Sequence, residues 1–128
     1  MNLLLDTHVA LWAIADSPAL PAAGRALIAD PGNEVWVSAV SVWEIAIKHA
    51  LDRGDMPVSG EEALQWFGEA GYRLLSITPA HAAAVGALPP HHQDPFDRLL
   101  LAQAQVEGMT LLTADDAVGR YGSPALQV

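Results

Sequence analysis

Short apolar runs that alternate with helical segments constrain the fold of this chain more than any other feature. Strands are expected where apolar and β-branched residues cluster for a few positions between turn residues. Helices are expected where apolar residues recur at helical spacing between caps and breakers. The expected strands cover residues 2–5, 34–38, 72–77 and 110–113, with a short fifth strand at 125–128.

The expected helices lie between these strands. They cover residues 8–15, 21–29, 41–52, 61–69, 79–86 and 95–107, and a helical turn follows at 115–121. A chain in which strands alternate with helices forms a parallel sheet with helices on both faces. The sequence therefore predicts an α/β fold, a three-layer α/β/α sandwich around a parallel sheet of four to five strands.

The length and composition fit one globular domain over residues 1–128. Hydrophobic residues make up 52% of the chain and charged residues 16%, which provides enough apolar surface for a packed core. No apolar stretch approaches the ~20 residues needed to span a bilayer, and the N-terminus lacks the basic region of a signal peptide. Without cysteine, disulfides and thiolate zinc sites are excluded. A cytoplasmic protein with no membrane partner is expected.

The charge balance is strongly acidic, with a formal net charge of −9 and only six Lys and Arg residues. Affinity for nucleic acids comes largely from basic side chains that neutralise phosphates, so this balance alone argues against a nucleic-acid binder. The objection weakens if bound metal neutralises several of the acids. An acidic surface also suits a basic protein partner.

Four acidic residues stand where an expected strand ends or an expected helix begins. Asp6 and Asp115 each follow an apolar run, while Glu44 and Asp97 lie near helix starts. Ligands of an open α/β sheet bind beyond the carboxyl ends of its strands, so these residues can meet in one pocket. Clustered carboxylates stay ionised together only beside a cation, and their oxygen atoms favour Mg²⁺ or Mn²⁺. The pattern indicates metal-assisted chemistry on phosphate esters.

Two of these acids also have a purely structural interpretation as helix caps. Asp6 can accept hydrogen bonds from the first backbone N–H groups of the next helix. Ser41 and Glu44 have the spacing of a capping box. If that helix begins nearer Ser38 instead, Glu44 falls in its second turn, where capping no longer explains it.

The other two acids have acidic neighbours that can take over the capping role. Asp94 precedes a proline and suits an N-cap, which leaves Asp97 in the first turn as the stronger candidate for a ligand. Either Asp115 or Asp116 can cap the last short helix. Asp115 lies closer to the end of the strand and is therefore the preferred site residue.

Several neighbouring residues are candidates for accessory roles. Thr7 can orient Asp6 or contact a phosphate, and Thr113 can hydrogen-bond a ligand or an acid. Arg98 can contact a phosphate or pair with a surface acid. His91 and His92 precede Asp94 and can flank the pocket, although the scattered histidines do not favour a histidine-based metal site.

Four segments of the sequence carry a family resemblance, and their order and spacing cover nearly the whole chain. They are Leu3-Leu4-Leu5-Asp6-Thr7, Ser38-Ala39-Val40-Ser41-Val42-Trp43-Glu44-Ile45, His92-Gln93-Asp94-Pro95-Phe96-Asp97-Arg98-Leu99-Leu100-Leu101-Ala102-Gln103-Ala104 and Leu111-Leu112-Thr113-Ala114-Asp115. The third segment is the most specific. With these segments the chain resembles the PIN-domain family, and within it the VapC-type toxins of bacterial type II toxin–antitoxin pairs.

The resemblance implies both a fold and an activity. It implies an α/β/α sandwich in which Asp6, Glu44, Asp97 and Asp115 surround Mg²⁺ or Mn²⁺. It implies an endoribonuclease that hydrolyses RNA phosphodiesters and leaves 5′-phosphate and 3′-hydroxyl ends. It also implies a homodimer and a VapB-like antitoxin whose basic segment lies in or near the acidic groove. The helices expected at 8–15 and 41–50 are candidates for the dimer face.

Three other interpretations fit the sequence less well. A haloacid-dehalogenase-type phosphatase needs a second Asp two residues after Asp6, where this chain has His8. A receiver-like signalling module that binds Mg²⁺ needs an Asp after the third strand, where Thr78 and Pro79 follow instead. A PIN-like module that only binds RNA or protein is disfavoured by the intact acidic quartet.

Overall fold

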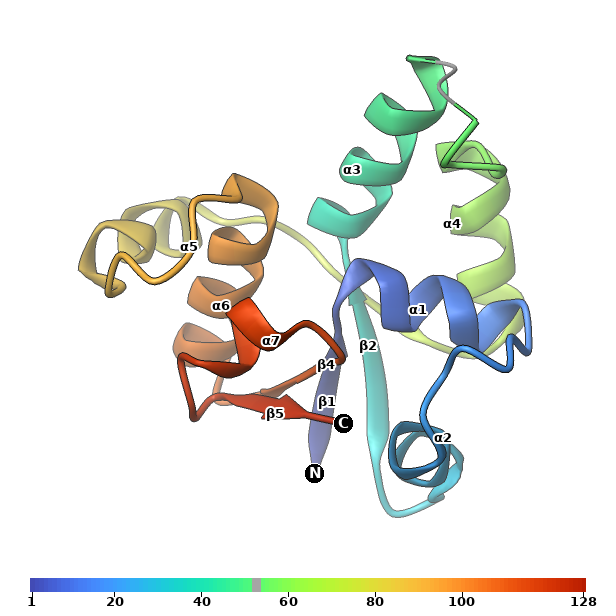
Figure 1. The fold of residues 1–128 in the computed structure, drawn as a ribbon, viewed down its shortest axis with the longest axis horizontal. Coiled ribbons are helices and arrows are strands. Elements are labelled where there is room, and N and C mark those ends of the chain that lie inside the picture. The colour runs from blue at the N-terminus through green and yellow to red at the C-terminus, as the bar shows by residue number, and fades with distance from the viewer. Residues whose placement is uncertain (52–53) are drawn as a thin grey trace.

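The computed structural model describes residues 1–51 and 54–128. Its five strands form one parallel sheet in the order β3-β2-β1-β4-β5. They are β1 (Asn2–Leu5), β2 (Glu34–Ser38), β3 (Arg73–Leu75), β4 (Thr110–Thr113) and β5 (Ala125–Gln127). The first strand lies at the centre, with β2 on one side of it and β4 on the other (Figure 1).

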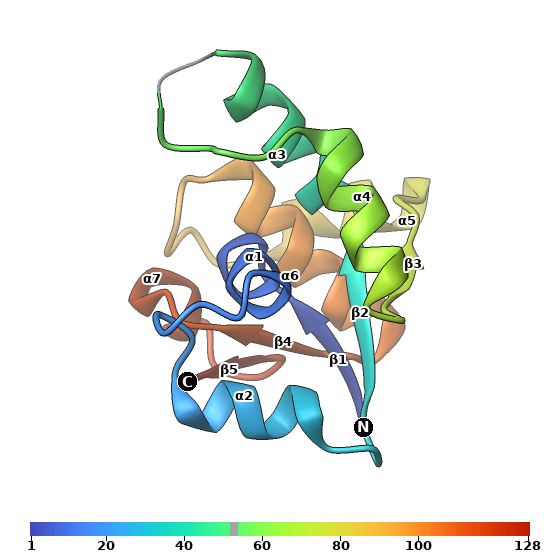
Figure 2. The same ribbon diagram turned by 90° about the vertical axis from the view of Figure 1, so that its right-hand side faces the viewer.

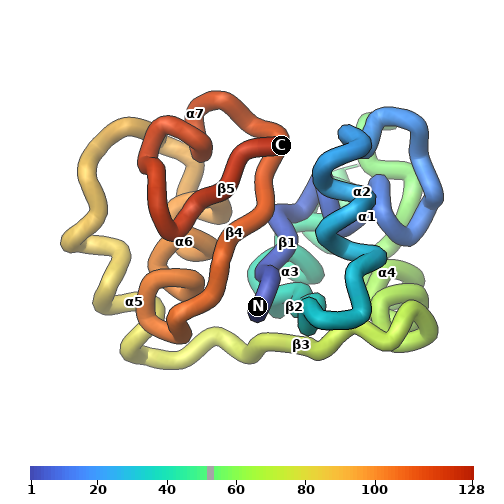
Figure 3. Tube along the Cα trace, turned by 90° about the horizontal axis from the view of Figure 1, so that it is seen from below, coloured from blue at the N-terminus to red at the C-terminus, as the bar shows by residue number. Residues whose placement is uncertain are grey.

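The helices between the strands are α1 (Thr7–Ile14), α2 (Ala22–Ala29), α3 (Ala39–Ala50), α4 (Gly60–Glu69), α5 (Pro79–Ala84), α6 (Pro95–Glu107) and α7 (Asp116–Gly119). A short 3₁₀ helix, Val85–Ala87, extends α5. Figure 3 shows α1, α2 and α4 on one side of the strands and α5 and α6 on the other. The predicted three-layer α/β/α sandwich is confirmed, including its fifth strand.

Alternation along the strands divides the core into two layers, because successive side chains of a strand point to opposite faces. Leu3 and Leu5 belong to the cluster under α1, α2 and α4, whereas Leu4 belongs to the cluster under α6 and α7. Helix α3 contributes to both clusters, through Ile45 and Val40 respectively. All five of these side chains are fully buried.

The start of α3 settles a choice that the sequence left open. Ser38 is the N-cap, and its hydroxyl accepts a hydrogen bond from the backbone N–H of Val40. The helix therefore begins at Ala39, two residues earlier than the expected Ser41, and the capping-box interpretation of Ser41 and Glu44 is wrong. Glu44 lies in the second turn. The expected end of this helix at Asp52 lies outside the described residues.

The edge strand β3 is shorter than the expected 72–77. The backbone N–H of Tyr72 donates to the carbonyl of Phe67 at the end of α4, so Tyr72 still belongs to the helix terminus. Helices α3 and α4 run side by side in Figure 2. They approach closely at Gly60, where an added Cβ would lie 2.9 Å from the Cβ of Ala46. A glycine at this position permits the contact.

Among the described residues, no helix combines the length and the apolar character required to cross a bilayer.

Candidate active site

The parallel sheet brings the carboxyl ends of β1, β2 and β4 to one edge, where α1, α3 and α7 begin (Figure 1). Asp6 directly follows β1 at this edge and caps α1, accepting a hydrogen bond of 2.8 Å from the backbone N–H of Val9. Its other carboxylate oxygen accepts a hydrogen bond of 2.5 Å from the hydroxyl of Thr113. Capping thus occupies only one oxygen of Asp6, so the structural and functional interpretations are compatible.

Residues near the C-terminal end of the chain influence the pKa of Asp6. Burial raises the pKa of its carboxyl group, although the hydrogen bonds from Thr113 and Val9 act in the opposite direction. The negative charge of Asp115 adds to the rise in pKa. Asp6 and Asp115, predicted to meet from opposite ends of the sequence, therefore lie close enough to repel each other.

Asp115 is the residue that caps α7. One of its oxygens accepts hydrogen bonds from the backbone N–H groups of Ala117 and Val118, and its own N–H donates to the hydroxyl of Thr113. Asp116 instead accepts a hydrogen bond from the side-chain amide of Gln127. Of the two acids, Asp115 therefore takes the capping role, and its role as a site residue stays a prediction.

Glu44 is buried, with 4% of its surface exposed. Its Oε1 accepts a hydrogen bond of 2.7 Å from the hydroxyl of Thr7. Its Oε2 accepts one of 2.5 Å from the ammonium of Lys48, one helical turn further on. Thr7 therefore connects the acid of α3 to the start of α1, and Asp6 lies next to Thr7 in the chain.

Asp97 lies in the first turn of α6, and its backbone N–H donates to the capping carboxylate of Asp94. Burial, the largest effect, raises the pKa of the Asp97 carboxyl to about 6, against a hydrogen bond from His92. The negative charges of Asp94 and Glu44 contribute to the rise. Asp97 is therefore within electrostatic reach of Glu44, so α3 and α6 direct acids towards the same region.

His92 is the site residue that sequence reasoning placed only beside the pocket. Its Nε2 lies 2.7 Å from Oδ2 of Asp97, and potential ligand atoms of His92, Asp94 and Asp97 all lie within 4.8 Å of one another. The spacing His92-Gln93-Asp94 was the available signal, because it puts an imidazole just ahead of the helix cap. His91 instead packs edge-to-face against Tyr121.

The guanidinium of Arg98 is engaged mainly by backbone carbonyls. It donates hydrogen bonds to the backbone carbonyls of Val85, Leu88, Pro89 and His92 and approaches the hydroxyl of Tyr121. These contacts hold the loop that carries His92 against α6. In the described part of the chain, the structure gives Arg98 no ion pair with an acid.

The donor set fits a hard divalent cation. The acids lie in two electrostatically coupled pairs, Asp6 with Asp115 and Asp97 with Glu44, and the potential ligand atoms that lie together belong to His92, Asp94 and Asp97. Oxygen-rich sites of this kind favour Mg²⁺ or Mn²⁺. The raised pKa values of Asp6 and Asp97 show that the protein alone stabilises their negative charges poorly. A bound cation would favour the ionised forms of both acids.

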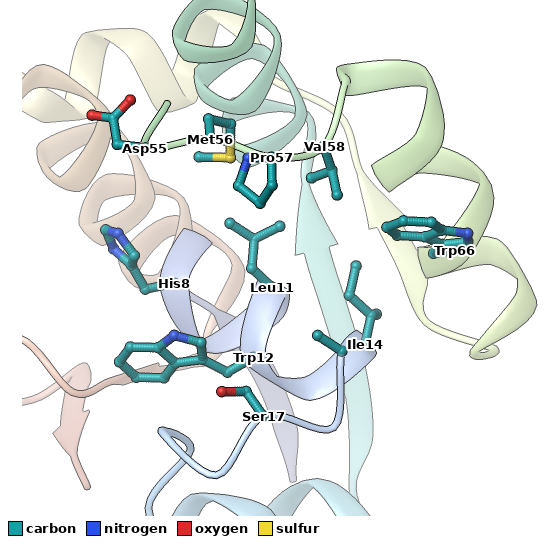
Figure 4. Close-up of a pocket in the computed structure, with 11 residues that line it drawn as sticks. His8, Leu11, Trp12, Ile14, Ser17, Asp55, Met56, Pro57, Val58 and Trp66 are labelled. Carbon is teal, nitrogen blue, oxygen red and sulfur yellow. The ribbon is translucent and has the colours of Figure 1, made fainter. Parts of the chain in front are cut away.

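A separate apolar pocket of about 250 Å³ lies beside α1. Figure 4 shows Leu11 and Trp12 of α1 on one side, Met56 to Val58 on another, and Trp66 of α4 beyond them. His8 also lines the pocket, two residues after Asp6. The pocket therefore adjoins the helix that begins at the acidic edge but contains none of the four quartet acids.

The sequence profile of the PIN domain matches residues 3–123, and the chain belongs to the PIN domain family. A relative from Mycobacterium tuberculosis, Ribonuclease VapC22, is 34% identical over 124 residues, which are 96% of this chain and 94% of that protein. The resemblance to VapC-type proteins predicted from the four segments is thereby confirmed.

Solved structures share the fold at low sequence identity. The VapBC2 structure from Rickettsia felis, bound to a promoter DNA fragment, aligns with a TM-score of 0.69 at 15% identity, covering 100% of this chain and 98% of that one. A toxin–antitoxin complex from Klebsiella pneumoniae aligns with a TM-score of 0.66 at 18% identity, covering 98% and 96% respectively.

Proposed function

We propose that this protein is a metal-dependent endoribonuclease and the toxin of a VapBC-type pair. The observation that carries the proposal is that acids from separate elements act on each other electrostatically, Asp115 on Asp6 and Glu44 on Asp97. Burial raises the pKa of two of these acids, Asp6 and Asp97, so their ionised forms need further stabilisation. The relative named as a ribonuclease supports RNA as the substrate.

Each side chain has a distinct role in the proposed site. Asp6 and Asp97 would bind Mg²⁺ or Mn²⁺ directly, while Glu44 and Asp115 would either complete the shell or orient metal-bound waters. The ion, when bound, supplies an acidified water and stabilises negative charge on the attacking and leaving oxygens. Thr7 and Thr113 hold Glu44 and Asp6 through the hydrogen bonds described above. His92 keeps Asp97 oriented.

The test is RNA-end mapping in cells that express the protein without any partner. New 5′-phosphate ends at a few sites are expected, and Asp97→Asn should abolish them while preserving the fold. Asp30→Asn is the matched control, because it removes the same charge from an exposed turn. If folded protein produces no new ends, or Asp97→Asn cleaves like the parent, the nuclease proposal fails and a binding role is favoured.

The proposed partner is a VapB-like antitoxin. Support comes from solved relatives described as VapBC or toxin–antitoxin complexes and from the net charge of −9, which favours a basic partner. The apolar pocket between α1 and Trp66 suits a hydrophobic segment of the antitoxin (Figure 4), with its basic segment reaching the nearby acids. Trp66→Glu should weaken co-purification of the two proteins. Unchanged co-purification would place the contact elsewhere.

A homodimer is also proposed, through α3. Trp43, Ile47 and Leu51 follow one another at four-residue spacing and are 52%, 37% and 51% exposed. Such spacing places them on one face of the helix, and Leu74 at the sheet edge is exposed as well. Continuous exposed apolar surface marks an interaction site. Of the two helices expected to supply the dimer face, α3 has the more exposed apolar stripe.

A further inference from the structure

Both carboxylate oxygens of Glu44 are occupied by side chains of the protein itself. Thr7 donates to Oε1 at 2.7 Å, and Lys48 donates to Oε2 at 2.5 Å. The Glu44 side chain is only 5% exposed, whereas that of Lys48 is 35% exposed. A cation that binds Glu44 through Oε2 must therefore share this oxygen with an ammonium or displace it.

Lys48 is the only lysine of the chain, and its charge lies within the acidic cluster. Arg25 and Arg73 pair with Asp16 and Glu34, and Arg98 is engaged by backbone carbonyls. Among the salt bridges of the described residues, that of Lys48 is the one in which a Lys or Arg contacts a quartet acid.

The ammonium compensates the negative charge that the cluster concentrates. Glu44 and Asp94 both act electrostatically on Asp97, so without a cation these acids repel one another. A lysine is suited to a reversible contact, because its ammonium is a compact charge on a flexible stem of four carbons. The partial exposure of Lys48 leaves space on the solvent side for that stem to move.

We propose that Lys48 is a resident counter-ion of the acidic site, which stabilises Glu44 in the metal-free protein and competes with the divalent cation for Oε2. The inference rests on the proposed function, since it assumes that the quartet binds a metal. In this role Lys48 is a positioning residue, and its contact with Glu44 lowers the affinity of the site for the metal. In this way it differs from a surface salt bridge, which would leave metal affinity unchanged.

The experiment measures Mn²⁺ binding to the metal-free protein by calorimetric titration, without RNA. Lys48→Met removes the charge but keeps a long flexible side chain and should bind Mn²⁺ about tenfold more tightly, because one positive charge near the ion is lost. Lys48→Arg should stay near the parent affinity. Arg73→Met is the matched control, because it removes one positive charge from an exposed pair with Glu34, and it should change affinity little.

Unfolding by urea provides a second measurement. In EDTA, Lys48→Met should be less stable than the parent, and saturating Mn²⁺ should shrink or reverse this difference, because the ion binds the folded variant more tightly. If Lys48→Met does not fold without metal, Lys48→Gln serves in both measurements, since it loses the charge but keeps a donor.

The outcomes separate this inference from the proposed function. If Asp97→Asn abolishes Mn²⁺ binding but Lys48→Met and Lys48→Gln bind Mn²⁺ no more tightly than the parent, only the counter-ion role is overturned. If Arg73→Met gains as much affinity as Lys48→Met, the effect is one of net charge and the inference fails. If Mn²⁺ binding is indifferent to Asp97→Asn, the metal site itself is wrong, and the role of Lys48 falls with it.

Discussion

The hydroxyl of Thr113 donates a hydrogen bond of 2.5 Å to the carboxylate of Asp6, across 107 residues of sequence. The parallel pairing of β1 with β4 creates this contact, because it aligns the carboxyl ends of the two strands. The same hydroxyl accepts from the backbone N–H of Asp115. Thr113 therefore links two acids of the proposed quartet.

Replacing Thr113 by Val should raise the pKa of Asp6 further, because the hydrogen bond that opposes the effect of burial is lost. We expect a loss of about 1–3 kcal/mol in the free energy of unfolding, typical for a buried partner left unsatisfied, and weaker Mn²⁺ binding. Urea unfolding and metal titration measure the two effects. Thr113→Ser retains the hydroxyl and should behave like the parent. Equal losses in both variants would contradict this role of the hydroxyl.

Asp97 should make the metal-free protein less stable as the pH rises. Its pKa of about 6 in the folded state exceeds the ordinary value of 3.8, so between these values the folded protein binds a proton that the unfolded chain has released. Stability contributed by the protonated acid is therefore lost over this range. Asp97→Asn should reduce the fall in stability between pH 4 and pH 7 by on the order of 2–3 kcal/mol, measured by urea unfolding in EDTA. If the stability of the two proteins changes with pH in the same way, the raised pKa of Asp97 is refuted.

His92 should affect the pH dependence of cleavage through Asp97. Its hydrogen bond lowers the pKa of Asp97 against the effect of burial, so His92→Ala should raise that pKa. Activity of the variant should consequently fall more steeply below neutral pH than activity of the parent. Cleavage of an RNA substrate at subsaturating Mn²⁺, where protons compete with the ion for Asp97, followed from pH 5.5 to 8, measures this. His91→Ala is the control, since His91 packs on Tyr121 instead, and an identical pH profile in both variants would rule out the role.

Arg98 should be required for stability as a planar donor and not simply as a charge. One terminal nitrogen contacts the carbonyl of Pro89 in the loop before α6, and the other contacts that of Val85 in the short 3₁₀ helix, a fork that lysine cannot reproduce. We expect Arg98→Lys to lower the free energy of unfolding by about 1–3 kcal/mol. Hydrogen exchange should increase in residues 85–92, and unchanged exchange there would contradict the proposed role in the loop.

The exposed stripe on α3 should determine the oligomeric state. Trp43 packs edge-to-face on Phe96 at a ring distance of 4.9 Å yet remains 52% exposed. Trp43→Glu should convert a dimer into a monomer, because it places a charge in an apolar interface, as measured by sedimentation or light scattering. Leu126→Glu, at an exposed residue of the opposite edge strand, should not. A Trp43→Glu variant that remains dimeric would exclude this face.

Much of the fold and part of the site could be predicted because the signals are local. Asp6 and Asp115 each cap a helix directly after an apolar strand, and Asp94 caps a helix just before a proline, so all three could be placed from their immediate neighbours. The alternation of strands with helices then predicts a parallel sheet. A parallel sheet gathers strand ends at one edge, which brings together acids that are distant in sequence.

The partners of these acids depended on the tertiary structure, because they lie on different elements. Only the packing of α1 against α3 decides that Thr7 donates to Glu44. Only the path of the loop before α6 decides that His92 meets Asp97 and that Arg98 binds carbonyls. The sequence by itself determined that Asp6 and Asp115 stand at the ends of strands, since capping and strand ends are local signals. The tertiary structure decided how deeply each acid is buried, which side chains it contacts and in which direction its pKa changes. These properties arise from neighbours that are far away in the chain.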